Sequence, residues 1–145
     1  MSLAYAYPHS RFEPAPIVDL NARDVRERLS ASALKGFFKL AQAWSLRDED
    51  ACVLLGGVSS SSYYEWKKNP QRVLEVDRLT RISYLLGIYK SLHILYGDNL
   101  ANNWVHLPNQ NVLFGGRTPL QYMLQGGLIA MQTVRQLLDA RRGGV

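Results

Sequence analysis

The sequence lacks most of the side chains that an enzyme, a metalloprotein or a secreted protein needs. Cys52 is the only cysteine, so no intrachain disulfide can form, and the chain is compatible with a reducing cytosol. The three histidines are far apart, at His9, His93 and His106, and no second histidine or carboxylate stands at metal-ligand spacing from them. No nucleophile lies beside a base. We therefore expect no metal, no cofactor and no catalytic activity.

Long apolar runs and a strong charge imbalance are also missing. No run approaches the roughly 20 apolar residues that cross a bilayer. The start, MSLAYAYPHSRFEPAP, has neither the basic opening nor the apolar core of a signal peptide. The net charge is only +5 and is spread along the chain, which weakly favours an anionic partner. These features predict a cytoplasmic protein without a membrane contact.

Apolar side chains repeat at helical spacing along most of the chain, which predicts an all-α fold. Residues 20–29 predict a short solvated helix, and residues 34–44 a stronger one with an apolar stripe. The stretches 76–86 and 88–96 predict two helices interrupted by Gly87. They are apolar on more than one side, so they form either a central core or a subunit interface. His93, among apolar neighbours, is predicted to be a packed, neutral core histidine.

Residues 45–70 have the pattern of a helix-turn-helix. Ser45 begins a capping box for a helix over 47–55, which Gly56-Gly57 ends, and a second helix runs from Val58 to the Asn69-Pro70 stop. Hydroxyls at a helix start and lysines at its end suit contacts with base edges and phosphates. The candidate DNA contacts are Ser59, Ser60, Ser61, Tyr64, Lys67 and Lys68. An ordinary helical hairpin with capping serines is the alternative, and Glu65 places a carboxylate near the phosphates.

The stretch 114–145 has strong helix-start and turn signals but no nucleophile–base pair and no metal-ligand set. Gly115-Gly116 permits positive φ, and Thr118-Pro119 with Gln121 predicts a capped helix start. Gly126-Gly127 is expected to end that helix before a longer one that runs to about residue 140. Its stripe of Leu128, Met131, Val134 and Leu138 predicts a core face, whereas Ile129, Gln132, Arg135 and Asp139 form a mixed face. The mixed face could meet another protein, or both faces could pack internally. The preceding Val112, Leu113 and Phe114 are expected to be buried.

From about residue 29 to the last residue, the chain resembles Xre/MbcA/ParS-type antitoxins, the partners of RES-domain toxins. The segments that carry the resemblance are LKGFFKLAQAW, VSSSSYYEWKK, LTRISYLLGIYKSLHILYG and NQNVLFGGRTPLQYMLQGGLIAMQTVRQLLDARRGG. The last segment is the most specific, because its glycine pairs, Arg-Thr-Pro-Leu and Asp-Ala-Arg-Arg-Gly-Gly occur together in order. Two features depart from the family pattern: the carboxylate of Glu65 and the doubled glycine at 56–57.

The resemblance implies an antitoxin of a type II system that binds and occludes the active site of an NAD-depleting RES-domain toxin. It also implies that the complex represses its own operon and that the chain is a homodimer within a hetero-oligomeric complex. The prolines near the start predict a flexible arm over 1–19. The resemblance implies a helix-turn-helix domain over 20–72, central core or dimerisation helices over 73–97 and a toxin-binding domain over 98–145. The implied toxin contacts are Gly115, Gly116, Arg117, Thr118, Pro119, Leu128, Arg135, Leu138, Asp139, Arg141, Arg142 and Val145. The alternative is a helix-turn-helix transcriptional regulator with a helical dimerisation domain and no toxin partner.

Overall fold

The computed structural model describes residues 18–143, and it confirms the all-α fold, since no strand occurs within that range. The α-helices of this range are α1 (Arg23–Ala43), α2 (Asp48–Leu54), α3 (Ser60–Lys68), α4 (Val76–Leu95), α5 (Asp98–Asn103) and α6 (Pro119–Arg142). Two 3₁₀ helices, η2 (Trp104–His106) and η3 (Val112–Phe114), join α5 to α6. Most of the expected arm over 1–19 and the candidate contact Val145 lie outside the described residues.

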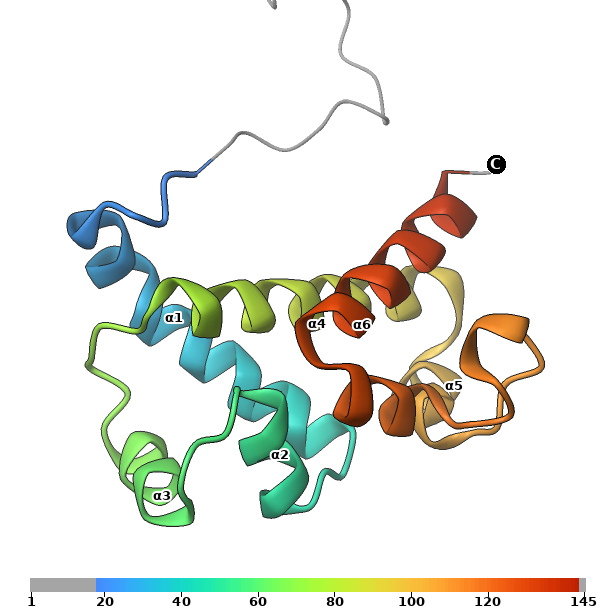
Figure 1. Cartoon of the computed structure of the whole chain (residues 1–145), viewed down its shortest axis with the longest axis horizontal. Helices are drawn as coiled ribbons and strands as arrows, with labels where there is room; N and C mark the ends of the chain where they lie inside the picture. The colour runs from blue at the N-terminus through green and yellow to red at the C-terminus, as the bar shows by residue number, and fades with distance from the viewer. Residues whose placement is uncertain (1–17, 144–145) are drawn as a thin grey trace, which may run out of the picture.

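Helix α4 is the centre of the fold. It packs against α1 on one side and against α6 on another, and Figure 1 shows it crossing the middle of the molecule. Its fully buried side chains include Ile82, Leu85, Ile88 and Leu92. Each such side chain contributes roughly 1.5–3 kcal/mol relative to an exposed one. Of the two interpretations of this apolar stretch, the structure therefore supports the central core.

The predicted interruption at Gly87 is wrong, because α4 is continuous through it. The reason lies in α6. The guanidinium of Arg135 lies directly over Gly87, and a Cβ at that position would be 1.8 Å from Nη1 of Arg135. A glycine that looks like a helix breaker in the sequence thus provides the space for a side chain 48 residues further along.

Two local predictions near the N-terminal half are also wrong. The stretches 20–29 and 34–44 form one continuous helix, α1. Ser30, in the middle of α1, connects this helix to a distant loop. The Oγ of Ser30 donates to the carbonyl of Arg26 (2.6 Å) and accepts from the amide of Leu74 (2.8 Å). Ser45 does not cap α2. It takes a left-handed φ of 51°, and the N-cap residue is Arg47, without a side-chain cap bond.

Helix α6 is bent where the sequence predicted a break. Gly127 takes φ 62° and ψ −141°, a conformation outside the helix, and the helix then continues to Arg142 (Figure 1). Beyond this kink Met131, Val134 and Leu138 are fully buried against the core, as the periodicity predicted. The kink thereby sets the direction of the second half of α6 relative to its first half.

The segment before α6 is only partly buried, contrary to expectation. Phe114 is fully buried and packs edge-on against Trp104 and Tyr122, but Val112 is 93% exposed, because the 3₁₀ turn points the two side chains in different directions. His93 is packed on Tyr89, yet it is not purely a core residue. Its Nδ1 lies 2.9 Å from Asp98 Oδ1 and its Nε2 lies 3.0 Å from Asn102 Oδ1, so it links α4 to α5.

Candidate functional site

The first candidate surface is the helix pair α2 and α3. Gly56 and Gly57, with φ of 99° and 88°, both occupy the left-handed region, so the doubled glycine is what the turn between the helices requires. Ser59 caps α3 by accepting a hydrogen bond from the amide of Ser62 (3.2 Å). Tyr63 then packs edge-on against Phe38 of α1 and is 1% exposed. This packing fixes α3 with its polar side facing outward.

All six candidate DNA contacts are exposed. Ser60, Tyr64 and Lys67 are spaced at i, i+4 and i+7, so they share one face of α3. Two of the three are already engaged within the chain. Tyr64 Oη donates to Asp48 Oδ2 of α2 (2.5 Å), and Lys67 Nζ lies 3.8 Å from Asp48 Oδ1. The hydrogen bond to Asp48 raises the pKa of Tyr64, and burial raises the pKa of Tyr63 to about 12.

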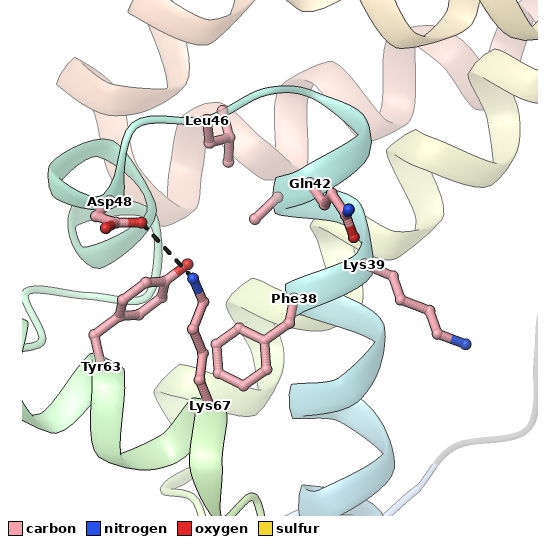
Figure 2. Close-up of a pocket in the computed structure, with 8 residues that line it drawn as sticks. Phe38, Lys39, Gln42, Leu46, Asp48, Tyr63 and Lys67 are labelled. Carbon is pink, nitrogen blue, oxygen red and sulfur yellow. Dashed lines mark ion pairs between the residues drawn. The ribbon is translucent and has the colours of Figure 1, made fainter.

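Asp48 and Lys67 both line a pocket of about 440 Å³ at the junction of α1, α2 and α3. Figure 2 shows this pair, with Phe38 and Tyr63 contributing aromatic walls and Lys39 extending away from it. The lining residues are Phe38, Lys39, Ala41, Gln42, Leu46, Asp48, Tyr63 and Lys67. Asp48 is the first residue of α2. Its pairing with α3 spans 19 residues of sequence, and no local signal reveals it.

The second candidate surface begins with the glycine loop before α6. Gly115 and Gly116 take φ of 57° and 85°. Thr118 and Gln121 form the predicted capping box: Thr118 Oγ1 accepts from the amide of Gln121 (3.1 Å), and Gln121 Oε1 accepts from the amide of Thr118 (3.0 Å). This confirms the helix start. The candidate contacts Gly115, Gly116 and Arg117 are all exposed in this loop.

Some candidate toxin contacts are not on the surface. Leu138 is fully buried and Pro119 is also buried, so both support the domain from within and neither offers side-chain surface. Leu128 and Thr118 are half-buried. Assigning Leu138 to a docking surface was wrong, because its side of α6 faces α4.

The four charged candidates of α6 turn toward α4. Arg135 Nε donates to Asp139 Oδ2 (3.1 Å), and the Arg135 guanidinium lies over Gly87 of α4. Arg141 Nη1 donates to the hydroxyl of Tyr96 (3.3 Å), and Arg142 Nη1 donates to the hydroxyl of Ser91 (3.2 Å). The same Ser91 Oγ lies 3.3 Å from Asp139 Oδ1. The structure therefore brings Arg135, Asp139 and Arg142 together into one polar network.

Two exposed apolar side chains of this region were not among the candidate contacts. Val112 is 93% exposed and Ile129 is 76% exposed. Single exposed apolar side chains are common on protein surfaces, and they mark an interaction site when they belong to a contiguous apolar patch. Ile129 belongs to the mixed face that the sequence did indicate, whereas the exposure of Val112 depends on the 3₁₀ turn.

Within residues 18–143, no three or more His, Cys, Asp or Glu side chains gather as they would around a metal ion. Over the same range, every helix is too short or too polar to span a membrane.

Comparison with known proteins matches the two parts of the chain that carry these surfaces to two domain families. Residues 22–87 match the family described as "Antitoxin Xre-like helix-turn-helix domain", and residues 91–144 match the one described as "Antitoxin Xre/MbcA/ParS C-terminal toxin-binding domain". The chain is also similar to the uncharacterized protein y4oB of Sinorhizobium fredii (strain NBRC 101917 / NGR234). The two are 39% identical over 112 residues, which cover 77% of this chain and 84% of the relative. Both matched domains are non-catalytic. The chain belongs to the Xre/MbcA/ParS-type antitoxins, with a helix-turn-helix domain followed by a toxin-binding domain.

Proposed function

We propose that this antitoxin binds a RES-domain toxin that depletes NAD and covers its active-site cleft with α6 and the basic tail. One observation carries the proposal: within the matched toxin-binding domain, Val112 and Ile129 expose large apolar side chains to water. Burying both against a partner would remove this unfavourable exposure.

The basic end of α6 supports a second part of the proposal, that Arg141 or Arg142 covers the region of the toxin that receives the phosphates of NAD. Guanidinium groups form strong, bidentate pairs with carboxylates. Each arginine is held in the free chain by one hydrogen bond to a hydroxyl, from Arg141 to Tyr96 and from Arg142 to Ser91. Such bonds contribute about 0.5–1.5 kcal/mol each. A toxin carboxylate can therefore replace them at little cost.

We further propose that the helix-turn-helix binds operator DNA and represses the operon of the antitoxin. The exposed Ser60, Ser61 and Lys68 of α3 support this role. In Figure 1, α3 and the C-terminal end of α6 lie at opposite corners of the molecule, so one chain can contact DNA and toxin together. A homodimer would present two such helices to a palindromic operator. The apolar side of α4 is occupied by the core, so dimerisation would use its remaining exposed residues, such as Ile94.

The toxin part is tested by co-expressing the chain with the RES-domain protein of a neighbouring reading frame, and by measuring co-purification and cellular NAD. Ile129→Asp should weaken toxin binding by at least about tenfold, because it places a charge in an apolar contact. Val53→Asp is the matched control. Val53 is a β-branched apolar residue like Ile129 and is also exposed (46%), but it lies on α2, outside the proposed toxin surface. Equal toxin binding by both variants would contradict the proposed surface.

The tail is tested by truncation in the same assay. Removing residues 141–145 should leave the folded chain intact and weaken inhibition, since only two side-chain bonds to hydroxyls are lost. If the truncated chain neutralises the toxin fully, the tail has no inhibitory role. A gel-shift series in rising salt tests the alternative function, a transcriptional regulator without a toxin partner. Tight, specific binding of operator DNA by the isolated chain favours that regulator.

A further inference from the structure

The first turn of α2 places one carboxylate in direct contact with α3. Asp48 accepts the hydrogen bond of Tyr64 at one oxygen, and its other oxygen lies 3.8 Å from the Lys67 ammonium. The Lys67 ammonium also lies over the Tyr63 ring, 4.9 Å from its centroid. Two polar groups of α3, the Tyr64 hydroxyl and the Lys67 ammonium, thus meet a single carboxylate of the preceding helix, and Figure 2 shows the pair of Asp48 and Lys67.

The neighbouring acids of the same turn are engaged elsewhere. Glu49 Oε1 lies 2.8 Å from Arg47 Nη1, and Asp50 Oδ2 lies 3.1 Å from Arg47 Nε. Both acids are therefore paired with Arg47, the N-cap residue of α2. The carboxylate of Asp48, by contrast, contacts α3, the helix that we propose binds DNA. This division of roles among three adjacent acids is visible only in the structure.

The position of Asp48 bears on nucleic-acid contact. In a helix-turn-helix, the first helix crosses the DNA backbone and the second enters the major groove. Phosphates would have to approach the same Lys67 ammonium and Tyr64 hydroxyl that Asp48 now holds. A carboxylate competes with phosphate for such donors and repels it as well. Asp48 and Lys67 are close to half exposed, so solvent screens their pair and a phosphate can displace it.

We propose that Asp48 is an intramolecular competitor that holds Lys67 and Tyr64 away from DNA phosphates and keeps the affinity of the helix-turn-helix for DNA low. This inference rests on the DNA-binding part of the proposed function. Lys67, the α3 lysine that contacts α2, is paired with Asp48 within the chain. Lys68, one residue further along, is exposed and stays available to phosphate.

The test compares Asp48→Asn with Glu49→Gln in the full chain. Both substitutions remove one negative charge from the first turn of α2, so they change net charge and helix-dipole stabilisation alike. The probe is a fluorescein-labelled 30-base-pair duplex from the DNA immediately upstream of the reading frame, with a scrambled duplex of the same composition beside it. Fluorescence anisotropy measures affinity between 50 and 250 mM salt.

Asp48→Asn should bind the upstream duplex about fivefold more tightly than Glu49→Gln at 0.1 M salt, since one more phosphate contact forms. Its log–log salt dependence should steepen by about 0.9, the slope for one released counterion. Adding Lys67→Ala to Asp48→Asn should abolish both gains, whereas Lys67→Ala alone should change affinity little, because that lysine is paired in the wild-type chain.

Equal affinities for Asp48→Asn and Glu49→Gln, with clear binding by both, would overturn the competitor and leave DNA binding intact. A gain that survives Lys67→Ala would overturn it too, since bulk charge would then explain the effect. If no variant binds either duplex at 50 mM salt, both the competitor and the operator function fall. The toxin part of the proposed function is unaffected by that outcome, because co-purification and NAD measurements test it separately.

Discussion

The two candidate surfaces of this antitoxin treat their exposed side chains in opposite ways. On α3, Tyr64 and Lys67 satisfy their polar groups within the chain, through Asp48. In the C-terminal region, Val112 and Ile129 leave apolar side chains uncovered by the rest of the fold. A surface that is already paired must break contacts before it binds, whereas an uncovered apolar surface gains by binding. We therefore expect the toxin-binding region to be the stronger of the two proposed docking surfaces.

The largest expected effect concerns the inner side of α6. Leu138→Ala should lower the free energy of unfolding by about 2–5 kcal/mol, because it leaves a cavity in a fully buried site. Leu128→Ala, at a half-buried position, should cost less than about 2 kcal/mol. Urea denaturation of both variants measures the difference. Equal losses would mean that the two leucines are not divided between core and surface as the structure divides them.

A smaller effect is expected from the left-handed glycines, one in each region. Gly127→Ala should cost about 1–3 kcal/mol, since φ 62° with ψ −141° is a conformation that only glycine adopts readily. Gly57→Ala should cost about 1–2 kcal/mol, because φ is 88° but no atom lies within 4 Å of the added Cβ.

Binding assays on these two variants sharpen the comparison between the regions. Gly127→Ala should impair toxin co-purification and spare DNA binding, and Gly57→Ala should do the reverse. Loss of both activities in either variant would show that the regions are coupled through α4 and do not act separately.

The smallest effect is confined to the helix-turn-helix and to alkaline pH. Burial raises the pKa of Tyr63 to about 12, above its unfolded value of about 10. The folded state therefore binds this proton more tightly, so the stabilisation is complete below pH 10 and is lost as the pH rises toward 12. Thermal unfolding of wild type and Tyr63→Phe from pH 9 to 11.5 measures this. Tyr63→Phe should show the shallower decline, and identical slopes would contradict the assignment.

Much of the candidate site could be predicted from the sequence because its signals are local. The Thr118 capping box and the break at Gly127 each depend on residues within a few positions, and the structure confirms both. The apolar spacing of α6 likewise identified the face that contains Met131 and Val134. Local hydrogen bonds and helical periodicity act over one or two turns, so the order of residues is enough to reveal them.

The sequence by itself determined an all-α chain with a glycine turn between two short helices and a kinked, capped C-terminal helix. Only the tertiary structure decided which side of each element is free. It placed Arg135 over Gly87, so a helix that seemed broken is continuous. It left Val112 exposed where the sequence predicted burial, and it set Asp48 against Lys67. The contacts of Arg135 with Gly87 and of Asp48 with Lys67 join residues 48 and 19 positions apart, and such contacts form only when the helices pack.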